Sequence, residues 1–82
     1  MVVSEFSPKF EKTIKKIRDQ DLKDKLKKQI EKIINNPEIG KPMKYARKGT
    51  REVYIPPFRL SYSYLKNENK IIFLALYHKD EQ

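Results

Sequence analysis

The fold of this chain is decided by three consecutive segments: Phe58-Arg-Leu-Ser-Tyr-Ser-Tyr64, Lys66-Asn-Glu-Asn69 and Ile71-Ile-Phe-Leu-Ala-Leu-Tyr77. In the first segment, apolar and aromatic residues alternate with Arg59 and two serines, which predicts a strand with one buried face. The second segment is a polar turn. The third is apolar on both faces, as is typical of a central strand that helices cover on at least one side.

The stretch before these segments predicts a further strand, Arg51-Glu-Val-Tyr-Ile55. Alternation places Val53 and Ile55 on its inner face and Glu52 and Tyr54 on its outer face. Pro56-Pro57 ends the strand, because proline lacks the backbone N–H that a sheet ladder needs, and predicts a tight connection.

The first half of the chain predicts two amphipathic helices. Ser7 before Pro8 is typical of a helix start, with serine at the N-cap and proline at the first helical position. We expect Asp21 to cap the second helix and Asn35-Asn36-Pro37 to end it. Apolar residues at helical spacing mark one face of each helix: Phe10, Ile14 and Ile17 in the first, and Leu22, Leu26, Ile30 and Ile33 in the second. Because the turn between them is very short, the two helices should form an antiparallel hairpin.

The length of the chain limits its organisation. An 82-residue chain has too few apolar residues for two cores, so residues 1–82 are expected to form a single domain. With residues 1–6 as a short first strand, the elements follow the order β-α-α-β-β-β. The sequence thus predicts an α+β fold in which a helical hairpin packs on a small, mainly antiparallel sheet.

Composition excludes several classes of site. The chain has no cysteine and one histidine, which excludes a disulfide framework and an ordinary zinc site. It contains no glycine-rich phosphate loop and no nucleophile elbow, so we expect no metal and no cofactor. No segment resembles a signal peptide, and the longest apolar run is far shorter than the about 20 residues that cross a bilayer. We therefore expect a soluble, cytoplasmic protein with no membrane partner.

The formal net charge is +8, and the placement of the cations is informative. Acid-before-base pairs four residues apart, such as Asp21 with Lys25, indicate that many helix lysines belong to a solvated face. In residues 37–60, six basic side chains stand against only Glu38 and Glu52: Lys41, Lys44, Arg47, Lys48, Arg51 and Arg59. Such a surplus attracts polyanions in a strongly salt-dependent way.

Arg59 is the first candidate for function. Its planar guanidinium grips a phosphate with two hydrogen bonds and stays charged at any relevant pH. The alternative is an ion pair with Glu52 on the neighbouring strand. The residue pattern alone leaves both interpretations open.

A cationic loop and the histidine are the other candidates. Four cations surround Tyr45: Lys44, Arg47, Lys48 and Arg51. Cations interleaved with an aromatic ring suit single-stranded nucleic acid, whereas an ordinary basic loop is the alternative. His78 is the natural proton-transfer group near neutral pH, although a lone histidine at a strand end is more often a solvated residue.

The order of these motifs resembles the RelE/ParE toxin superfamily over nearly the whole chain. The most specific part is Phe58-Arg-Leu-Ser-Tyr62, followed by a polar turn and an apolar strand that ends in His78. The resemblance implies a metal-independent endoribonuclease, an mRNA interferase that cuts messenger RNA in the ribosomal A site and so inhibits translation. Such toxins activate a ribose 2′-hydroxyl for attack on the adjacent phosphate. A cognate, RelB-like antitoxin with an acidic segment is the expected partner.

The resemblance also assigns residues. The family's phosphate-binding arginine corresponds to Arg59, and the terminal histidine of one branch, a general acid or base, corresponds to His78. Arg51 is expected beside them in the catalytic set, with Arg59 and His78 converging on one phosphate. Six further residues are expected to bind RNA, although the cluster from Lys44 to Lys48 matches the family's RNA-binding region only in character: Lys44, Tyr45, Arg47, Lys48, Tyr54 and Lys79.

The chain departs from the family pattern in two places. Glu52 and Tyr54 stand where the best-known members present two lysines. The catalytic C-terminal tyrosine is missing, and Tyr77 or Tyr54 are the candidates to replace it. Two other functions therefore stay open: a ParE-like inhibitor of DNA gyrase, and a degenerate relative that binds RNA without cleaving it.

Overall fold

The computed structural model describes residues 2–43 and 49–81. The elements run in this order: β1 (Val3–Phe6), α1 (Pro8–Lys16), α2 (Gln20–Asn35), β2 (Lys41–Pro42), β3 (Thr50–Ile55), β4 (Phe58–Leu65), the 3-10 helix η2 (Lys66–Glu68), β5 (Lys70–His78) and the 3-10 helix η3 (Lys79–Glu81). The order is the predicted one, with the short strand β2 added between α2 and β3. Within the described ranges, no helix is long and apolar enough to cross a membrane.

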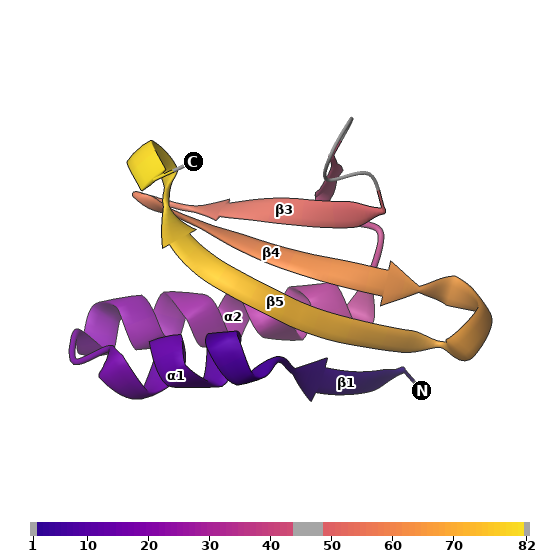
Figure 1. Ribbon diagram of the computed structural model, residues 1–82, viewed down its shortest axis with the longest axis horizontal. Coiled ribbons are helices and arrows are strands. Elements are labelled where there is room, and N and C mark those ends of the chain that lie inside the picture. Colours follow the sequence, from indigo (N-terminus) through magenta and orange to yellow (C-terminus); the bar gives the residue numbers. More distant parts are fainter. Residues whose placement is uncertain (1, 44–48, 82) are drawn as a thin grey trace.

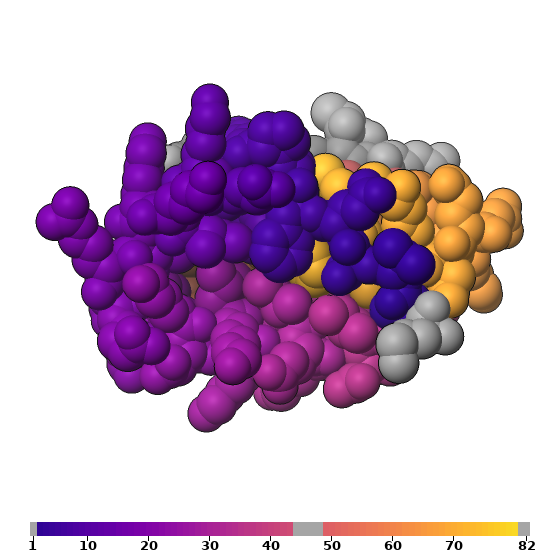
Figure 2. All heavy atoms as spheres, turned by 90° about the horizontal axis from the view of Figure 1, so that it is seen from below, coloured from indigo at the N-terminus to yellow at the C-terminus, as the bar shows by residue number. Residues whose placement is uncertain are grey.

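The sheet has five strands in the order β1-β5-β4-β3-β2. Neighbouring strands are antiparallel, except that β1 runs parallel to β5. Both α-helices lie on the same face of the sheet, with α1 against β5 and α2 against β3 (Figure 1). Figure 2 looks onto this face, where the helices cover one part and β1 lies beside the β4–β5 end. The predicted fold, a helical hairpin on a mainly antiparallel sheet, is confirmed.

Capping residues explain where the helices begin. The Ser7 side chain accepts a hydrogen bond from the Phe10 N–H at 3.1 Å, and Pro8 stands in the first turn, as predicted. The predicted cap of α2 is wrong, because Asp19 rather than Asp21 accepts two N–H groups of the first turn. Asp21 lies inside that turn, where its negative charge favours the positive end of the helix dipole.

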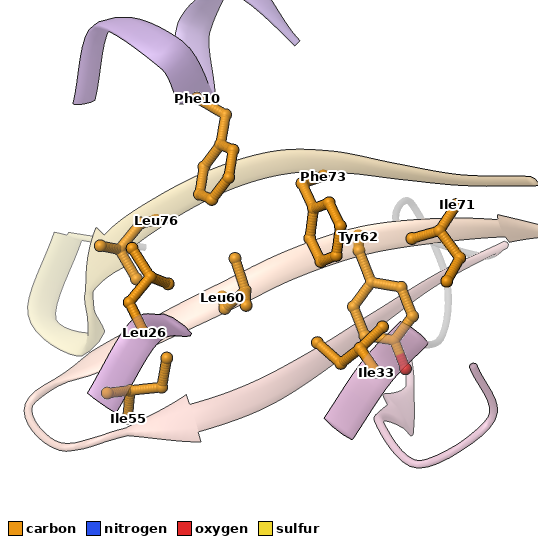
Figure 3. Packing of buried hydrophobic residues seen from close by; sticks show 9 residues of the cluster. All are labelled: Phe10, Leu26, Ile33, Ile55, Leu60, Tyr62, Ile71, Phe73 and Leu76. Carbon is orange, nitrogen blue, oxygen red and sulfur yellow. The ribbon is translucent and has the colours of Figure 1, made fainter. Parts of the chain in front are cut away.

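The core lies between the helices and the sheet (Figure 3). Phe10 of α1 stacks on Phe73 of β5, with ring centroids 5.8 Å apart. The predicted apolar stripes are confirmed, because Phe10, Leu26 and Ile33 are buried and the other stripe residues pack against them. The strands supply the rest of the buried cluster: Ile55, Leu60, Tyr62, Ile71, Phe73 and Leu76.

A bulge in β5 determines which of its residues face the helices. Ser61 of β4 pairs with Ala75 and Tyr62 pairs with Phe73, so Leu74 is an extra residue in the ladder. The Ser7 hydroxyl donates to the Leu74 carbonyl at 2.8 Å, so one side chain both caps α1 and holds the bulge. Because side chains alternate along a strand, one extra residue exchanges the two faces for every later residue of β5.

The connection from α2 to β2 is held by a buried tyrosine. The Tyr62 hydroxyl accepts the Gly40 N–H at 2.9 Å and donates to the Pro37 carbonyl at 2.8 Å. A Cβ on residue 40 would stand 2.6 Å from this hydroxyl, so the close approach requires glycine. Burial raises the pKa of Tyr62 above its ordinary value of 10.0, and the Gly40 hydrogen bond and the Arg51 charge oppose this more weakly.

We expect Tyr62→Phe to lower the free energy of unfolding by about 1 to 3 kcal/mol, because the Gly40 N–H and the Pro37 carbonyl lose their partner. Tyr64→Phe, on the same strand but only partly buried, is the matched control and should change it by less than about 0.5 kcal/mol. Urea denaturation at neutral pH measures both. Equal effects of the two substitutions would contradict the role of the Tyr62 hydroxyl.

The raised pKa of Tyr62 also predicts a pH dependence. The unfolded chain loses the phenol proton first, so the stability due to Tyr62 is fully present below about pH 10 and is lost as the pH rises further. The stability difference between the natural protein and Tyr62→Phe should therefore be constant below this pH and shrink above it. Denaturation curves of both proteins on either side of it measure the difference. A difference that stays constant or grows is the contrary result.

Candidate functional site

The sheet face turned away from both α-helices, called here the open face, carries polar side chains in rows. Register places Tyr54 of β3, Arg59 of β4 and Tyr77 of β5 side by side. The next row runs from β2 to β5: Lys41, Glu52, Ser61 and Ala75. Because Ser61 and Ala75 are small, longer side chains of the first row have room to reach across them.

Glu52 is a buried carboxylate within the open face. It points away from the helices, as the alternation predicts, but it is only 7% exposed. The Tyr77 hydroxyl reaches across β4 and donates a hydrogen bond to Oε2 of Glu52. Arg59 Nη1 lies 3.7 Å from Oε1. Neighbouring side chains thus take the place of the water that a carboxylate otherwise requires.

Arg59 makes the ion pair with Glu52 that the sequence left open as an alternative to phosphate binding. The contact at 3.7 Å is longer than the bidentate geometry that arginine and carboxylate prefer. The Arg59 side chain also stays 37% exposed. The guanidinium therefore remains accessible from solvent, and this ion pair is compatible with phosphate binding.

A pocket of about 490 Å³, called here the Arg59 groove, opens beside these residues. Its lining residues are Lys41, Met43, Glu52, Val53, Tyr54, Arg59 and Lys79. Among the described residues of the lining, Lys41, Arg59 and Lys79 outnumber the one carboxylate, Glu52, so this part of the lining is positively charged. Tyr54, which is 50% exposed, adds an aromatic ring. The structure thus brings two predicted RNA-binding residues, Tyr54 and Lys79, to the same pocket as Arg59.

His78 does not share the face of Arg59. It pairs with Phe58, and the two rings lie edge to face with centroids 5.6 Å apart, so His78 points to the side that carries the helices. The expected convergence of Arg59 and His78 on one phosphate is therefore wrong. The physical reason is the bulge at Leu74, which exchanges Tyr77 and His78 between the two faces.

Arg51 is also on the helix side, where it pairs with Tyr62. Its Nη1 donates to the Glu38 carbonyl at 3.0 Å and to the Gly40 carbonyl at 2.8 Å. These bonds tie the guanidinium to the connection between α2 and β2. The expected catalytic set of Arg59, His78 and Arg51 is thus divided between the two faces of the sheet.

The residues that the structure brings together at the site differ from the predicted set. Four predicted RNA-binding residues lie outside the described residues: Lys44, Tyr45, Arg47 and Lys48. The structure adds Lys41 and Glu52, and it places Tyr77, one of the candidates for the missing tyrosine, beside Glu52. In the part of the chain that the structure describes, no group of three or more His, Cys, Asp or Glu side chains is placed to hold a metal ion.

A second hollow, called here the helix groove, lies along the two helices. It has a volume of about 460 Å³, and most of its lining is apolar: Phe6, Ile14, Ile17, Leu26 and Ile30, with Lys23, Lys27 and Glu31. Phe6 is among the exposed large apolar residues, at 40%. Contiguous apolar surface on a small domain is typical of a site for another protein.

We expect Tyr77→Phe to lower the free energy of unfolding by about 1 to 3 kcal/mol, because the buried Glu52 carboxylate loses a hydrogen-bond donor. Tyr54→Phe removes a hydroxyl from the same face at an exposed position, and it should have an effect below about 0.5 kcal/mol. Urea denaturation compares the two variants. A Tyr77→Phe protein as stable as Tyr54→Phe would show that the hydroxyl does not support Glu52.

Several solved structures share this fold. The chain resembles a chain of the intact E. coli RelBE toxin–antitoxin complex, with a TM-score of 0.81, 14% identity, and coverage of 95% of this chain and 96% of that one. YafQ from E. coli matches with a TM-score of 0.75 and 26% identity, over 98% and 96% of the two chains. A metal-bound toxin from Helicobacter pylori matches with a TM-score of 0.73 and 26% identity, over 99% and 98%.

A family model matches almost the full length of the sequence. It is the model of the ParE toxin of the type II toxin–antitoxin system parDE, and it covers residues 4–82. A search of curated proteins found no match. The chain therefore belongs to the ParE toxin family of type II toxin–antitoxin systems, within the RelE/ParE superfamily that its motifs resemble.

Proposed function

We propose that this toxin binds messenger RNA in the ribosomal A site through the Arg59 groove and cleaves it as an endoribonuclease. The observation that carries the proposal is the gathering of Arg59, Lys41, Lys79 and the exposed Tyr54 ring around one open pocket. RelE-like toxins, which the sequence resembles, act on RNA in this way.

Arg59 is the group that would bind the scissile phosphate. Attack by the 2′-hydroxyl places additional negative charge on the phosphate oxygens, and a fixed guanidinium stabilises that charge. The strand register and the Glu52 ion pair restrict where the Arg59 side chain lies before RNA arrives. Such preorganisation lowers the cost of ordering the site during the reaction.

The rest of the groove suits the strand on either side of that phosphate. Lys41 and Lys79 supply charges for neighbouring phosphates, and Tyr54 supplies a ring on which a base can stack. Stacking of this kind tolerates any base, so the groove by itself favours single-stranded RNA of many sequences. Binding that depends on these cations should weaken as the salt concentration rises.

Inhibition of DNA gyrase is the second candidate function. The matching family model is that of ParE, and the sequence left a gyrase inhibitor open. An open cationic groove with an aromatic ring is what a nuclease needs for its substrate, and it is the reason to prefer RNA.

We expect Arg59→Ala to slow cleavage of ribosome-bound messenger RNA by at least about 100-fold, because the developing phosphate charge loses its main partner. Arg18→Ala removes the same charge from an exposed position between the helices, and it should leave cleavage within about twofold of the natural protein. His78→Ala should retain most of the activity, because its ring points to the other face. Mapping of messenger 5′ ends in a translation extract measures all three.

Two results would contradict this assignment. Equal cleavage by Arg59→Ala and Arg18→Ala would remove Arg59 from the site. An intact messenger, together with loss of DNA supercoiling by purified gyrase in the presence of the toxin, would establish the second candidate function instead.

The proposal includes a RelB-like antitoxin as partner, and the similar E. coli RelBE structure is itself a toxin–antitoxin complex. The lining of the helix groove contains apolar side chains together with Lys23 and Lys27. An amphipathic antitoxin segment with acidic residues along its edge would match both features. Covering this groove would also stabilise a small domain, since binding to the folded state alone favours that state.

We expect the double substitution Lys23→Glu and Lys27→Glu to weaken antitoxin binding by at least about tenfold, because like charges then face the acidic segment. The control, Lys9→Glu with Lys12→Glu, makes the same charge change on α1 away from the groove lining. The probe is a synthetic amphipathic peptide with acidic residues along one edge, and calorimetric titration measures its affinity for the toxin. Equal weakening by both pairs would point to overall charge rather than to the helix groove.

A further inference from the structure

Glu52 is a buried carboxylate in a groove whose other described charges are cationic, and this position needs a chemical explanation. The residue is only 7% exposed, yet it lines a groove whose other charged lining residues, among those that the structure describes, are Lys41, Arg59 and Lys79. A negative group at this place repels the phosphates that the cations attract. A carboxylate here is better explained by a reaction step than by affinity.

Side chains from two neighbouring strands are among the groups that restrain this carboxylate. Tyr77 of β5 donates its hydroxyl proton to Oε2, and Arg59 of β4 lies 3.7 Å from Oε1. The restraint matters because a general base must stand within hydrogen-bond distance of the proton that it removes. Since both restraining groups come from paired strands, the sheet register fixes Glu52 relative to Arg59.

Glu52 and Arg59 lie close together, as the two groups that react in RNA do. The 2′-hydroxyl and the oxygens of the adjacent phosphate are neighbours in RNA. Arg59 and Glu52 are likewise neighbours that line the same groove. A phosphate bound by Arg59 would therefore bring its own 2′-hydroxyl towards the Glu52 carboxylate.

We infer that Glu52 is the proton acceptor for the 2′-hydroxyl in RNA cleavage, an inference that rests on the proposed function. The Glu52 carboxylate takes the 2′-hydroxyl proton while the 2′-oxygen forms a bond to phosphorus. The bond from phosphorus to the 5′-oxygen breaks, and that oxygen takes a proton from water. The products are a 2′,3′-cyclic phosphate and a free 5′-hydroxyl, and Glu52 then releases its proton to water.

Tyr77 is a positioning residue in this scheme, because it acts through Glu52. Its hydroxyl holds one carboxylate oxygen, and the bulge at Leu74 is what brings it to this face. The same bulge turns His78 away. The structure thus offers a carboxylate in place of the imidazole as the group that accepts the proton.

The test is single-turnover cleavage of messenger RNA on programmed ribosomes, with RNA affinity measured in parallel. Glu52→Gln keeps the shape and an acceptor for Tyr77 but removes the base, so cleavage at saturation should fall at least about 100-fold. RNA affinity should stay equal or become tighter, because one negative charge leaves the groove. Glu52→Asp keeps a carboxylate on a shorter side chain, so its cleavage rate should lie between the rates of Glu52→Gln and of the natural protein. Glu68→Gln, the same change in η2, is the control and should cleave like the natural protein.

Each result is decisive. Cleavage by Glu52→Gln within about threefold of the natural protein, or a loss confined to RNA affinity, would overturn the role of Glu52. If Glu52→Gln does not fold, Glu52→Asp decides the question, since a shifted base slows cleavage without changing affinity. Failure of the natural protein to cleave a messenger whose 2′-hydroxyls are intact would refute the proposed function itself. The two failures are therefore distinguishable.

Discussion

Two short helices can cover only one face of a five-stranded sheet, and this limit shapes the whole molecule. The covered face holds the apolar cluster in which Phe10, Phe73 and Tyr62 meet. The open face has to contact water or a partner, so it carries Arg59, Tyr54 and Tyr77 instead. The apolar core and the proposed RNA site thus lie on opposite sides of the same strands. Even Tyr62, which is fully buried, serves stability by fixing the chain after α2.

A single inserted residue decides which side chains of β5 reach the open face. The extra residue Leu74 is held by Ser7, so the start of α1 and the end of β5 are coupled through one hydroxyl. Beyond the bulge, Tyr77 faces Glu52, and His78 packs against Phe58. The chemistry available on the open face therefore depends on a backbone feature three residues away.

The sequence predicts most of the fold, because helix periodicity, the Ser7-Pro8 start and strand alternation are local signals. The prediction that Asp21 caps α2 is wrong because both Asp19 and Asp21 are good capping residues, and only the geometry of the turn selects Asp19. The site is harder to predict. Strand alternation correctly predicts that Glu52, Tyr54 and Arg59 share one face of the sheet. No residue type signals the bulge at Leu74, so the sequence predicts His78 on the face where Tyr77 lies. The burial of Glu52 depends on a contact across three strands, which no local pattern encodes.

The central claim is that RNA binds on the open face rather than along the lysine-rich helices. The most direct test is a titration of isotope-labelled toxin with a short single-stranded RNA, followed by NMR. The account predicts chemical-shift changes centred on Lys41, Glu52, Tyr54, Arg59 and Lys79, with α1 and α2 unchanged. Chemical-shift changes confined to the lysines of α1 and α2, with no change on the open face, would contradict this claim.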